Sequence, residues 1–102
     1  MAAPLITVLM PFHNEEAHLQ ECLESIRRQK FVNYELLAVD DHSSDRSVEC
    51  INSWATEDNR IRLLQSPEKG LVAALNYGLQ KAKASLIARM DADDIMHPDR
   101  IQ

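Results

Sequence analysis

Acidic residues are concentrated in one short segment near the end of this 102-residue chain. The segment MDADDIMHPDR, residues 90–100, places Asp91, Asp93 and Asp94 directly after the apolar run SLIARM. Carboxylates this close repel one another unless a cation neutralises them, and such hard oxygen ligands suit Mg²⁺ or Mn²⁺ better than zinc. Aspartate is also common in solvated turns, where its side chain bonds to nearby backbone. The segment alone leaves both interpretations open.

Polar residues follow two other apolar runs in the same way. PFHNEE, residues 11–16, comes after the first run, and Asp41, His42 and Ser43 come after the run YELLAVD. If these runs are parallel strands, their carboxyl ends share the edge of the sheet where open α/β proteins bind ligands. The chain has neither G-x-G-x-x-G nor a P-loop motif, so a metal would have to neutralise a bound phosphate. This convergence favours a metal and diphosphate site over a turn.

The hydrophobic pattern predicts the elements that would position these residues. Short apolar runs rich in branched side chains predict strands at residues 5–10, 34–40, 61–64 and 85–90, with Pro11 closing the first. Apolar spacings of three and four predict three intervening helices, whose inward stripes are Leu19, Cys22, Leu23 and Ile26; Val48, Ile51 and Ala55; and Val72, Leu75, Leu79 and Ala82. The residues expected to begin these helices are Asn14, Ser43 or Ser44, and Gly70. This alternation predicts a three-layer α/β/α fold with a mostly parallel, Rossmann-like sheet.

Composition limits the partners of this fold. The chain is 45% apolar and 26% charged, as expected for one globular domain over residues 1–102. Its net charge is -5 and its basic residues are scattered, which argues against nucleic acid. We find no transmembrane segment and no signal peptide, so the expected setting is the cytoplasm. Cys22 and Cys50 are expected to be buried thiols. His97 and Pro98 would start a fourth helix, so we expect the full-length protein to continue beyond residue 102.

Three segments, in order, resemble the N-terminal, nucleotide-sugar-binding half of a glycosyltransferase family 2 enzyme with the GT-A fold. ITVLMPFHNEEAHLQECLESIRRQ resembles the opening strand and helix of that family, and YELLAVDDHSSDRS resembles its second strand and acid pair. EKGLVAALNYGLQKAKASLIARMDADDIMHPDRI resembles its third helix, fourth strand and DxD loop. The resemblance covers almost the whole chain. It departs from the family pattern at His13, usually an aromatic such as tyrosine, and at His42, usually glycine.

The resemblance implies a set of site residues. The nucleotide-binding residues that it implies are Pro11, His13, Glu15, Asp41, Asp91 and Ala92. Within that set, Asp41 would accept a hydrogen bond from the base. The metal ligands that it implies are Asp91 and Asp93, with Mn²⁺ or Mg²⁺ between the phosphates. Asp40 is expected to be structural instead, bonding the backbone of its own turn.

The resemblance also implies a reaction. It is the inverting transfer of a sugar from a nucleotide-diphosphate donor (a UDP-, GDP- or dTDP-sugar) to a hydroxyl of a glycan or lipid-linked acceptor. The product would be a cell-surface glycan made at the cytoplasmic face of a membrane. The general base of that family lies downstream of the DxD loop, so no catalytic residue is expected within this chain, and the chain alone is expected to transfer no sugar.

Two other functions are compatible with parts of the pattern. The first alternative is a non-catalytic nucleotide-sugar-binding or interaction module. The second is a metal-dependent phosphohydrolase, which would need an aspartate nucleophile where the first apolar run instead ends in Pro11 and Phe12. We rank the phosphohydrolase last.

Overall fold

The computed structural model describes residues 4–29 and 33–90. Strands and helices alternate along this part of the chain, in the order β1 (Ile6–Phe12), α1 (Glu16–Arg27), β2 (Tyr34–Asp40), α2 (Ser47–Glu57), β3 (Ile61–Gln65), α3 (Leu71–Lys81) and β4 (Leu86–Arg89). The four strands form one parallel sheet in the order β3-β2-β1-β4. The predicted fold class and the predicted order of elements are therefore confirmed.

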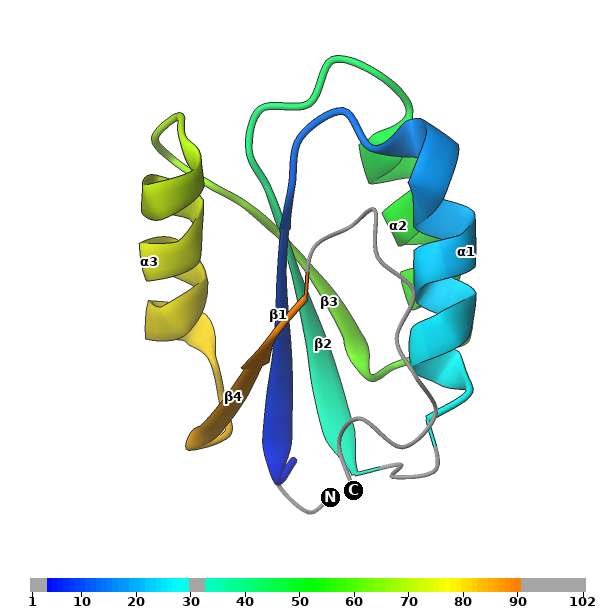
Figure 1. Ribbon diagram of the computed structural model, residues 1–102, viewed down its shortest axis with the longest axis vertical. Helices are drawn as coiled ribbons and strands as arrows, with labels where there is room; N and C mark the ends of the chain where they lie inside the picture. Colours follow the sequence, from blue (N-terminus) through cyan, green and yellow to red (C-terminus); the bar gives the residue numbers. More distant parts are fainter. Residues whose placement is uncertain (1–3, 30–32, 91–102) are drawn as a thin grey trace.

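The sheet is the middle of three layers. Helices α1 and α2 cover one face and α3 covers the other (Figure 1). Strands β2 and β3 follow β1 toward one edge of the sheet, whereas β4 returns to the opposite side of β1. The strand order thus reverses between β1 and β4, and open α/β sheets bind their ligands at the carboxyl ends of strands beside such a reversal.

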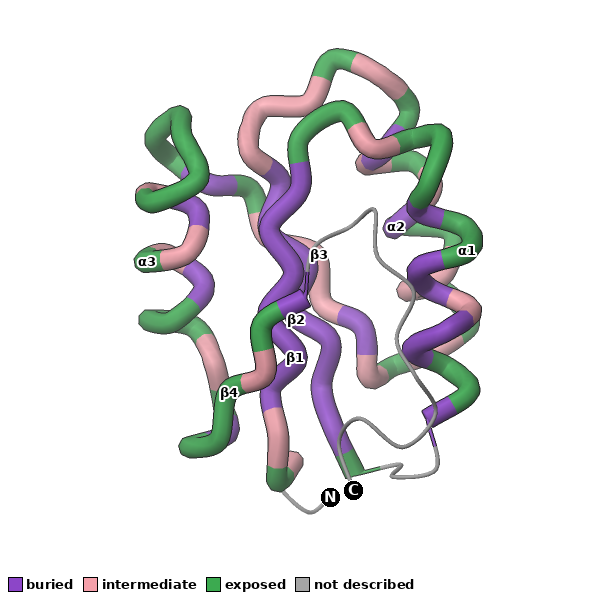
Figure 2. Tube along the Cα trace, viewed as in Figure 1, coloured by how far each residue is buried: buried purple, intermediate pink, exposed green. Residues whose placement is uncertain are grey.

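Alternate residues of the strands supply two cores, one on each face of the sheet. Val8, Met10 and Phe12 of β1 pack with α1 and α2, whereas Leu9 packs with Ala74 of α3. All four predicted inward residues of α1 are buried, as is Ile51 of α2. The central strands β1 and β2 are accordingly the most buried of the described elements (Figure 2). Of the two cysteines, both free thiols, Cys22 is buried as predicted and Cys50 is only half-buried.

The predicted inward stripe of α3 is wrong at two positions. Val72 is 70% exposed and Leu79 is 50% exposed, whereas Ala74 and Gly78 face the sheet. A β-carbon at Gly78 would collide with Leu9 and lie 3.1 Å from a methyl group of Val39. Because α3 lies this close to the sheet, its contact face needs small residues, and the larger apolar ones turn outward.

Pro11 does not close the first strand as predicted. Strand β1 continues through Pro11, which pairs with Val39, to Phe12. Backbone groups of alternate residues in a strand point to the same neighbour, so Pro11 faces the β4 side, as Leu9 does when it accepts from Met90. Strand β4 pairs with β1 only as far as Leu9. The missing N–H of Pro11 therefore removes no ladder hydrogen bond among the described residues.

A buried carboxylate connects the strands at the opposite end of the sheet. Glu35 is 4% exposed and accepts hydrogen bonds from the Thr7 hydroxyl at 2.6 Å, the Lys83 N–H at 2.7 Å and Arg62 Nη1 at 2.8 Å. The Thr7 hydroxyl in turn accepts from the Ala84 N–H at 3.2 Å. Burial alone would raise the pKa of Glu35, but these hydrogen bonds and the charge of Arg62 together leave it below its ordinary value. This network ties β1, β2 and β3 to the segment that enters β4.

Candidate functional site

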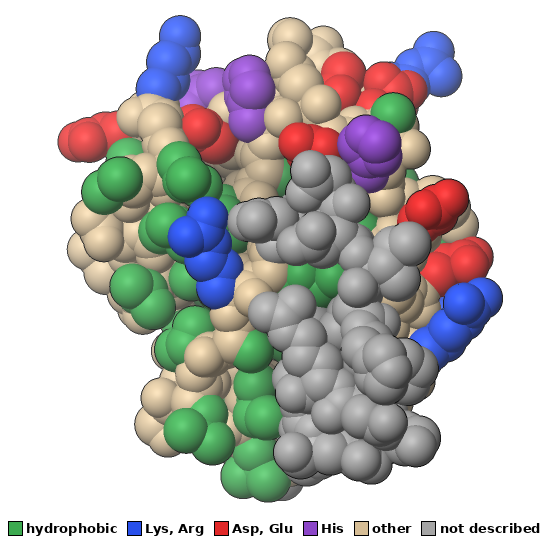
Figure 3. Space-filling model, in the orientation of Figure 1, with side chains coloured by type: hydrophobic (Ala, Val, Ile, Leu, Met, Phe, Trp, Pro, Cys, Tyr) green, Lys and Arg blue, Asp and Glu red, His purple; other side chains and the backbone are tan. Residues whose placement is uncertain are grey.

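The polar residues predicted to converge do so at the carboxyl ends of β1 and β2. The loop after β1 contains His13 and Asn14, and the loop after β2 contains Asp41 and His42. Histidine and acidic side chains gather along this upper rim of the molecule, whereas hydrophobic side chains occupy the opposite corner over α3 and β4 (Figure 3). Main-chain pairing extends past the strand ends, since the Asp41 N–H donates to the Phe12 carbonyl at 2.8 Å. The two loops therefore leave the sheet side by side.

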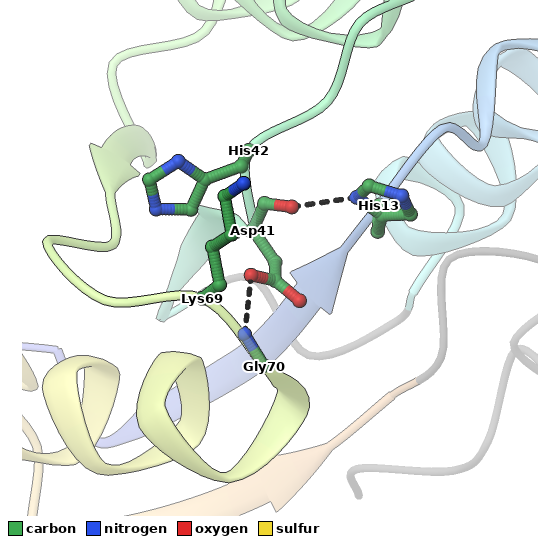
Figure 4. Close-up of a pocket in the computed structure, with 5 residues that line it drawn as sticks. All are labelled: His13, Asp41, His42, Lys69 and Gly70. Carbon is green, nitrogen blue, oxygen red and sulfur yellow. Dashed lines mark hydrogen bonds between the residues drawn. The ribbon is translucent and has the colours of Figure 1, made fainter.

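Asp41 stands at the centre of a small cavity on this rim. The cavity has a volume of about 170 Å³ and is lined by His13, Asp41, His42, Lys69 and Gly70. Asp41 Oδ1 accepts the backbone N–H of Gly70, the residue that precedes α3, at 2.8 Å (Figure 4). Favourable interaction with the positive end of the helix dipole adds to this hydrogen bond. Asp41 Oδ2 has no hydrogen-bond partner in the part of the chain that the structure describes.

His13 lies on the other side of Asp41. Its Nδ1 is 2.6 Å from the Asp41 carbonyl oxygen (Figure 4), and because a carbonyl only accepts, Nδ1 carries the proton. In the neutral ring Nε2 is then an acceptor, and the Asn14 side-chain amide lies 3.3 Å from it. The ring is exposed at the mouth of the cavity, where its face is available for stacking on a planar ligand.

The two loops bond each other's backbone at the starts of α1 and α2. The N–H groups of Asn14, Glu15 and Glu16, which lead into α1, donate to side chains of the opposite loop at 3.0, 2.9 and 3.1 Å; the acceptors are Ser43 Oγ, Ser47 Oγ and Asp45 Oδ2. In return, Asn14 Oδ1 accepts from the N–H groups of Ser44 and Asp45 at 2.7 and 3.3 Å, and Glu16 Oε1 accepts from the Arg46 N–H at 3.3 Å. Neither helix receives a side-chain hydrogen bond from its own N-cap residue. We call these six contacts the cross-cap.

The cross-cap corrects the predicted helix starts. Helix α2 begins at Ser47, not after Ser43 or Ser44, and α1 begins after Glu15, not directly after Asn14. Asn14 has a φ of 51°, in the left-handed region, so its backbone cannot serve as an ordinary N-cap. Asn14, Ser43 and Ser44 bond instead across the loops, ahead of the helices. Gly70 precedes α3 as predicted.

Asp45 is the most hydrogen-bonded carboxylate of the cross-cap. It accepts the N–H of Ser47 at 2.9 Å in addition to that of Glu16. Burial alone would raise the pKa of Asp45, but hydrogen bonds from Ser47 and the backbone outweigh it and hold the pKa below its usual range. The contacts between the two loops therefore favour the ionised form of Asp45.

The other predicted site residues fall in different places. Pro11 is buried within β1 and does not line the cavity, and Glu15 is half-buried at the start of α1. Asp40 is 2% exposed and accepts the Ser43 N–H at 3.0 Å, which confirms its predicted structural role. Asp91, Ala92 and Asp93, with the adjacent Asp94, lie outside the described residues. Of the predicted nucleotide-site residues that the structure describes, only His13 and Asp41 line the cavity.

Three cavity residues were not among the predicted site residues. Gly70 contributes its backbone N–H, which no side-chain pattern reveals, and Lys69 precedes it. His42 has a φ of 56°. This left-handed conformation explains why glycine suits the position. The departure from the family's usual glycine at His42 was the feature of the sequence that pointed to this residue. His42 Nε2 is buried without a hydrogen-bond partner in the described residues.

No metal centre is formed by the described residues. Within 4–29 and 33–90, no group of three or more His, Cys, Asp or Glu side chains is placed to hold a metal ion. Among the described residues, Asp41 is the one acid that lines the cavity, and one of its oxygens accepts the Gly70 N–H. The predicted metal ligands, Asp91 and Asp93, lie outside the described residues, so the metal site stays a prediction.

The family follows from comparison with known sequences. The family model described as glycosyl transferase family 2 matches residues 7–102. The chain belongs to glycosyltransferase family 2. This confirms the resemblance noted in the sequence.

Relatives in bacteria carry the same segment within longer chains. The chain is 38% identical over 103 residues to an uncharacterised glycosyltransferase of Haemophilus influenzae, covering 100% of this chain and 41% of that protein. It is 39% identical over 99 residues to the glycosyltransferase GlyG of Streptococcus pneumoniae, covering 96% of this chain and 33% of that protein. The chain thus spans less than half the length of either relative.

Solved structures share the fold. The mannosyltransferase PcManGT of Pyrobaculum calidifontis, solved with GDP-Man and Mn²⁺, is 28% identical with a TM-score of 0.81, over 91% of this chain and 28% of that one. TarS of S. aureus, residues 1–349, solved with UDP-GlcNAc, is 24% identical with a TM-score of 0.84, over 92% of this chain and 28% of that one. The family 2 chain therefore has the Rossmann-like architecture of GT-A glycosyltransferases. None of its described helices is long and apolar enough to cross a membrane.

Proposed function

We propose that this family 2 chain binds the nucleotide of a sugar donor, with the base in the cavity around Asp41. The observation that carries the proposal is the geometry of that carboxylate. Gly70 holds Oδ1 at 2.8 Å, Oδ2 is unpartnered in the described part of the chain, and the His13 ring bonds the main-chain carbonyl of the same residue at 2.6 Å. A fixed carboxylate and an aromatic ring that line the same cavity are suited to a planar ligand that presents an N–H at its edge.

The number of available oxygens favours one kind of base. Uracil and thymine present a single imide N–H between two carbonyl oxygens, which one carboxylate oxygen can accept. Guanine presents two adjacent N–H donors, for which a carboxylate with both oxygens available would be the better match. Because Gly70 occupies Oδ1 of Asp41, we propose a uridine- or thymidine-type donor ahead of GDP. Among the structural neighbours, TarS was solved with UDP-GlcNAc and PcManGT with GDP-Man.

The phosphates and the metal would lie beyond the base. We assign Asp91, Ala92 and Asp93 to this part of the site, with Mn²⁺ or Mg²⁺ held by Asp91 and Asp93, while Pro11 and Glu15 support the nucleoside side. A divalent cation there would stabilise the charge on the departing diphosphate. Support for it comes from the hard oxygen donors and from the Mn²⁺ in the PcManGT structure. Lys69, at the cavity wall, adds a positive charge on the side of α3.

The reaction proposed for the full-length protein is inverting transfer of the sugar to an acceptor hydroxyl of a glycan or lipid-linked molecule. Residues 1–102 form the donor-binding part of that enzyme and contain no general base. The setting we propose is the cytoplasm, at the cytoplasmic face of a membrane where cell-surface glycans are assembled. The longer bacterial glycosyltransferases that contain this segment support the proposal that it is one part of a larger enzyme.

A substitution at Asp41 tests the base site directly. In Asp41→Asn the amide oxygen can keep the Gly70 hydrogen bond, which places the NH₂ group where Oδ2 now stands. That NH₂ would oppose the imide N–H of UDP and would suit the ring acceptor of CDP. Loss of a hydrogen bond to a charged group costs about 1.5–3 kcal/mol, so we expect UDP to bind at least about tenfold more weakly.

Calorimetric titration of UDP, dTDP, GDP and CDP against both chains, with and without Mn²⁺, measures this. We expect wild type to prefer UDP or dTDP, and Asp41→Asn to shift the preference toward CDP. Gln20→Ala, on the exposed side of α1, is the control and should bind as wild type does. Equal affinity of wild type and Asp41→Asn for UDP would refute the proposed base site.

A further inference from the structure

We propose that Asn14 is a positioning residue for the nucleotide site, and that its side chain sets the orientation and tautomer of His13. The inference rests on the proposed function, because it concerns the same cavity. It starts from the place of Asn14 between the two loops. Its side chain makes contacts on both sides, while its own backbone N–H donates to Ser43 Oγ at 3.0 Å.

The two ends of the Asn14 side chain act on different walls of the cavity. Oδ1 accepts the N–H groups of Ser44 and Asp45 at 2.7 and 3.3 Å, and so holds the loop that carries Asp41. Nδ2 lies 3.3 Å from His13 Nε2 and can only donate. A donor at that distance requires Nε2 to be the acceptor, which is the tautomer already needed for the 2.6 Å hydrogen bond from Nδ1 to the Asp41 carbonyl.

This arrangement fixes the assignment of the Asn14 amide. Two backbone N–H groups point at Oδ1, so the oxygen must be there, and the nitrogen must face His13. The backbone conformation adds a second requirement, because φ of 51° is reached more readily by asparagine than by most residues. Asparagine satisfies all three demands at once: left-handed backbone, acceptor toward one loop and donor toward His13.

The position of His13 matters for the ligand. The ring is exposed at the mouth of the cavity and is held at one nitrogen by Asp41 and at the other by Asn14. A ring held at both nitrogens has a defined face for stacking, whereas a ring held at one nitrogen can rotate. Removing the Asn14 amide therefore loosens His13 and the Asp41 loop together.

Two variants separate these contributions. Asn14→Gly accepts the left-handed φ but removes both side-chain contacts, and Asn14→Asp keeps the oxygen for Ser44 and Asp45 but removes the donor to His13. The matched control is Gln20→Ala, which removes a hydrogen bond from Trp54 Nε1 at 3.1 Å. That bond joins α1 to α2 and lies outside both loops of the site, so the control reports the effect of losing a contact between the two helices that follow these loops.

The first measurement is ring-nitrogen NMR of His13 in the ligand-free chain, with amide exchange of Ser44 and Asp45. We expect Asn14→Asp and Asn14→Gly to lose the single Nδ1-protonated tautomer. Only Asn14→Gly should also speed exchange of the two amides, by about tenfold or more. The control should change neither. Unchanged His13 nitrogen shifts in both variants would overturn the proposal, even if their melting temperatures fall.

The second measurement is UDP affinity of the same chains. We expect Asn14→Gly to weaken binding by about tenfold, through the loss of two or three hydrogen bonds that hold the site, and the control to bind as wild type does. Wild-type affinity in Asn14→Gly, despite altered His13 shifts, would also overturn the proposal. If wild type itself binds no nucleotide, the proposed function fails, and the His13 shifts alone then decide the role of Asn14.

Discussion

Replacing Glu35 by glutamine should destabilise the domain at a point far from the cavity. Glutamine can keep its oxygen toward Thr7 and the Lys83 N–H, which both donate to Glu35 Oε2. Its NH₂ group then faces Arg62 Nη1, which now donates to Oε1 at 2.8 Å. The substitution thus exchanges one charge-assisted hydrogen bond for two opposed donors, while leaving the size of the side chain unchanged.

The size of the stability loss follows from the exposure of the Glu35 and Arg62 side chains. The Glu35 side chain is 5% exposed, so the lost hydrogen bond is not replaced by water on that side. The Arg62 side chain is 31% exposed and also bonds the Lys81 carbonyl, so the guanidinium can recover part of its hydration. We therefore expect a loss of about 2 kcal/mol, below the cost of leaving a fully buried charge unpaired. For a domain of this size that lowers the melting temperature by roughly 8 to 15 °C.

The stability difference between wild type and Glu35→Gln should become smaller as the pH falls. Because the pKa of Glu35 is lowered in the folded chain, its stabilisation is fully present above the unfolded value of about 4.3. It is lost as the pH falls through the lowered folded pKa. The gap between wild type and Glu35→Gln should hold from pH 7 to pH 5 and shrink below about pH 4.

Urea unfolding of wild type, Glu35→Gln, Arg62→Gln and the double variant measures the coupling. We expect an interaction energy of about 1 kcal/mol or more between the two positions at pH 7. A coupling under about 0.5 kcal/mol, or a gap that persists unchanged at pH 3, would show that the carboxylate of Glu35 is not what stabilises this end of the sheet.

The two glycines of the chain and His42 give three further predictions. Gly78→Ala should destabilise by about 1 kcal/mol in urea unfolding, because overpacking against Leu9 and Val39 outweighs the gain in helix propensity; a more stable variant would contradict the close packing of α3. Gly70→Ala meets no atom within 4 Å but has a φ of 111°, so strain alone should cost about 1–3 kcal/mol, and an unchanged melting temperature would argue against that backbone conformation. His42→Gly relieves a left-handed φ of 56° and a buried Nε2 without a partner among the described residues, so its melting temperature should rise by a few degrees.

The fold was predictable because its pattern is local. Short apolar runs alternate with stretches of helical period, and a parallel sheet buried on both faces needs such runs for its strands. The stripe of α1 was predicted correctly since its side chains are large and all point into one core. The stripe of α3 was not, because the distance between α3 and the sheet is set by tertiary packing. A periodic apolar pattern does not reveal that Gly78 must lie against Leu9.

The site was predictable only in part, for a related reason. Strand ends could be placed from the sequence, so His13 and Asp41 were correctly expected at one edge. The cavity also uses the Gly70 N–H, which is supplied by a loop 29 residues after Asp41 in the chain. Backbone donors have no sequence signature, and neither does a cap that comes from another loop. Ser43 and Ser44 were therefore assigned to their own helix, although they bond Asn14.

The scarcity of glycine connects these observations. With two glycines in 102 residues, the loops beside the cavity place Asn14 and His42 in left-handed conformations that glycine would adopt at lower cost. A glycine-rich loop binds phosphate through its backbone and gains its shape from flexibility. Here the loops gain their shape from side chains that bond across to the neighbouring loop, as Asn14 Oδ1 does with the Ser44 N–H. Such loops are held in place before any ligand arrives, and a preformed cavity loses less conformational entropy on binding. Substitutions in the cross-cap should therefore weaken ligand binding more than substitutions of comparable cost to stability elsewhere on α1 and α2.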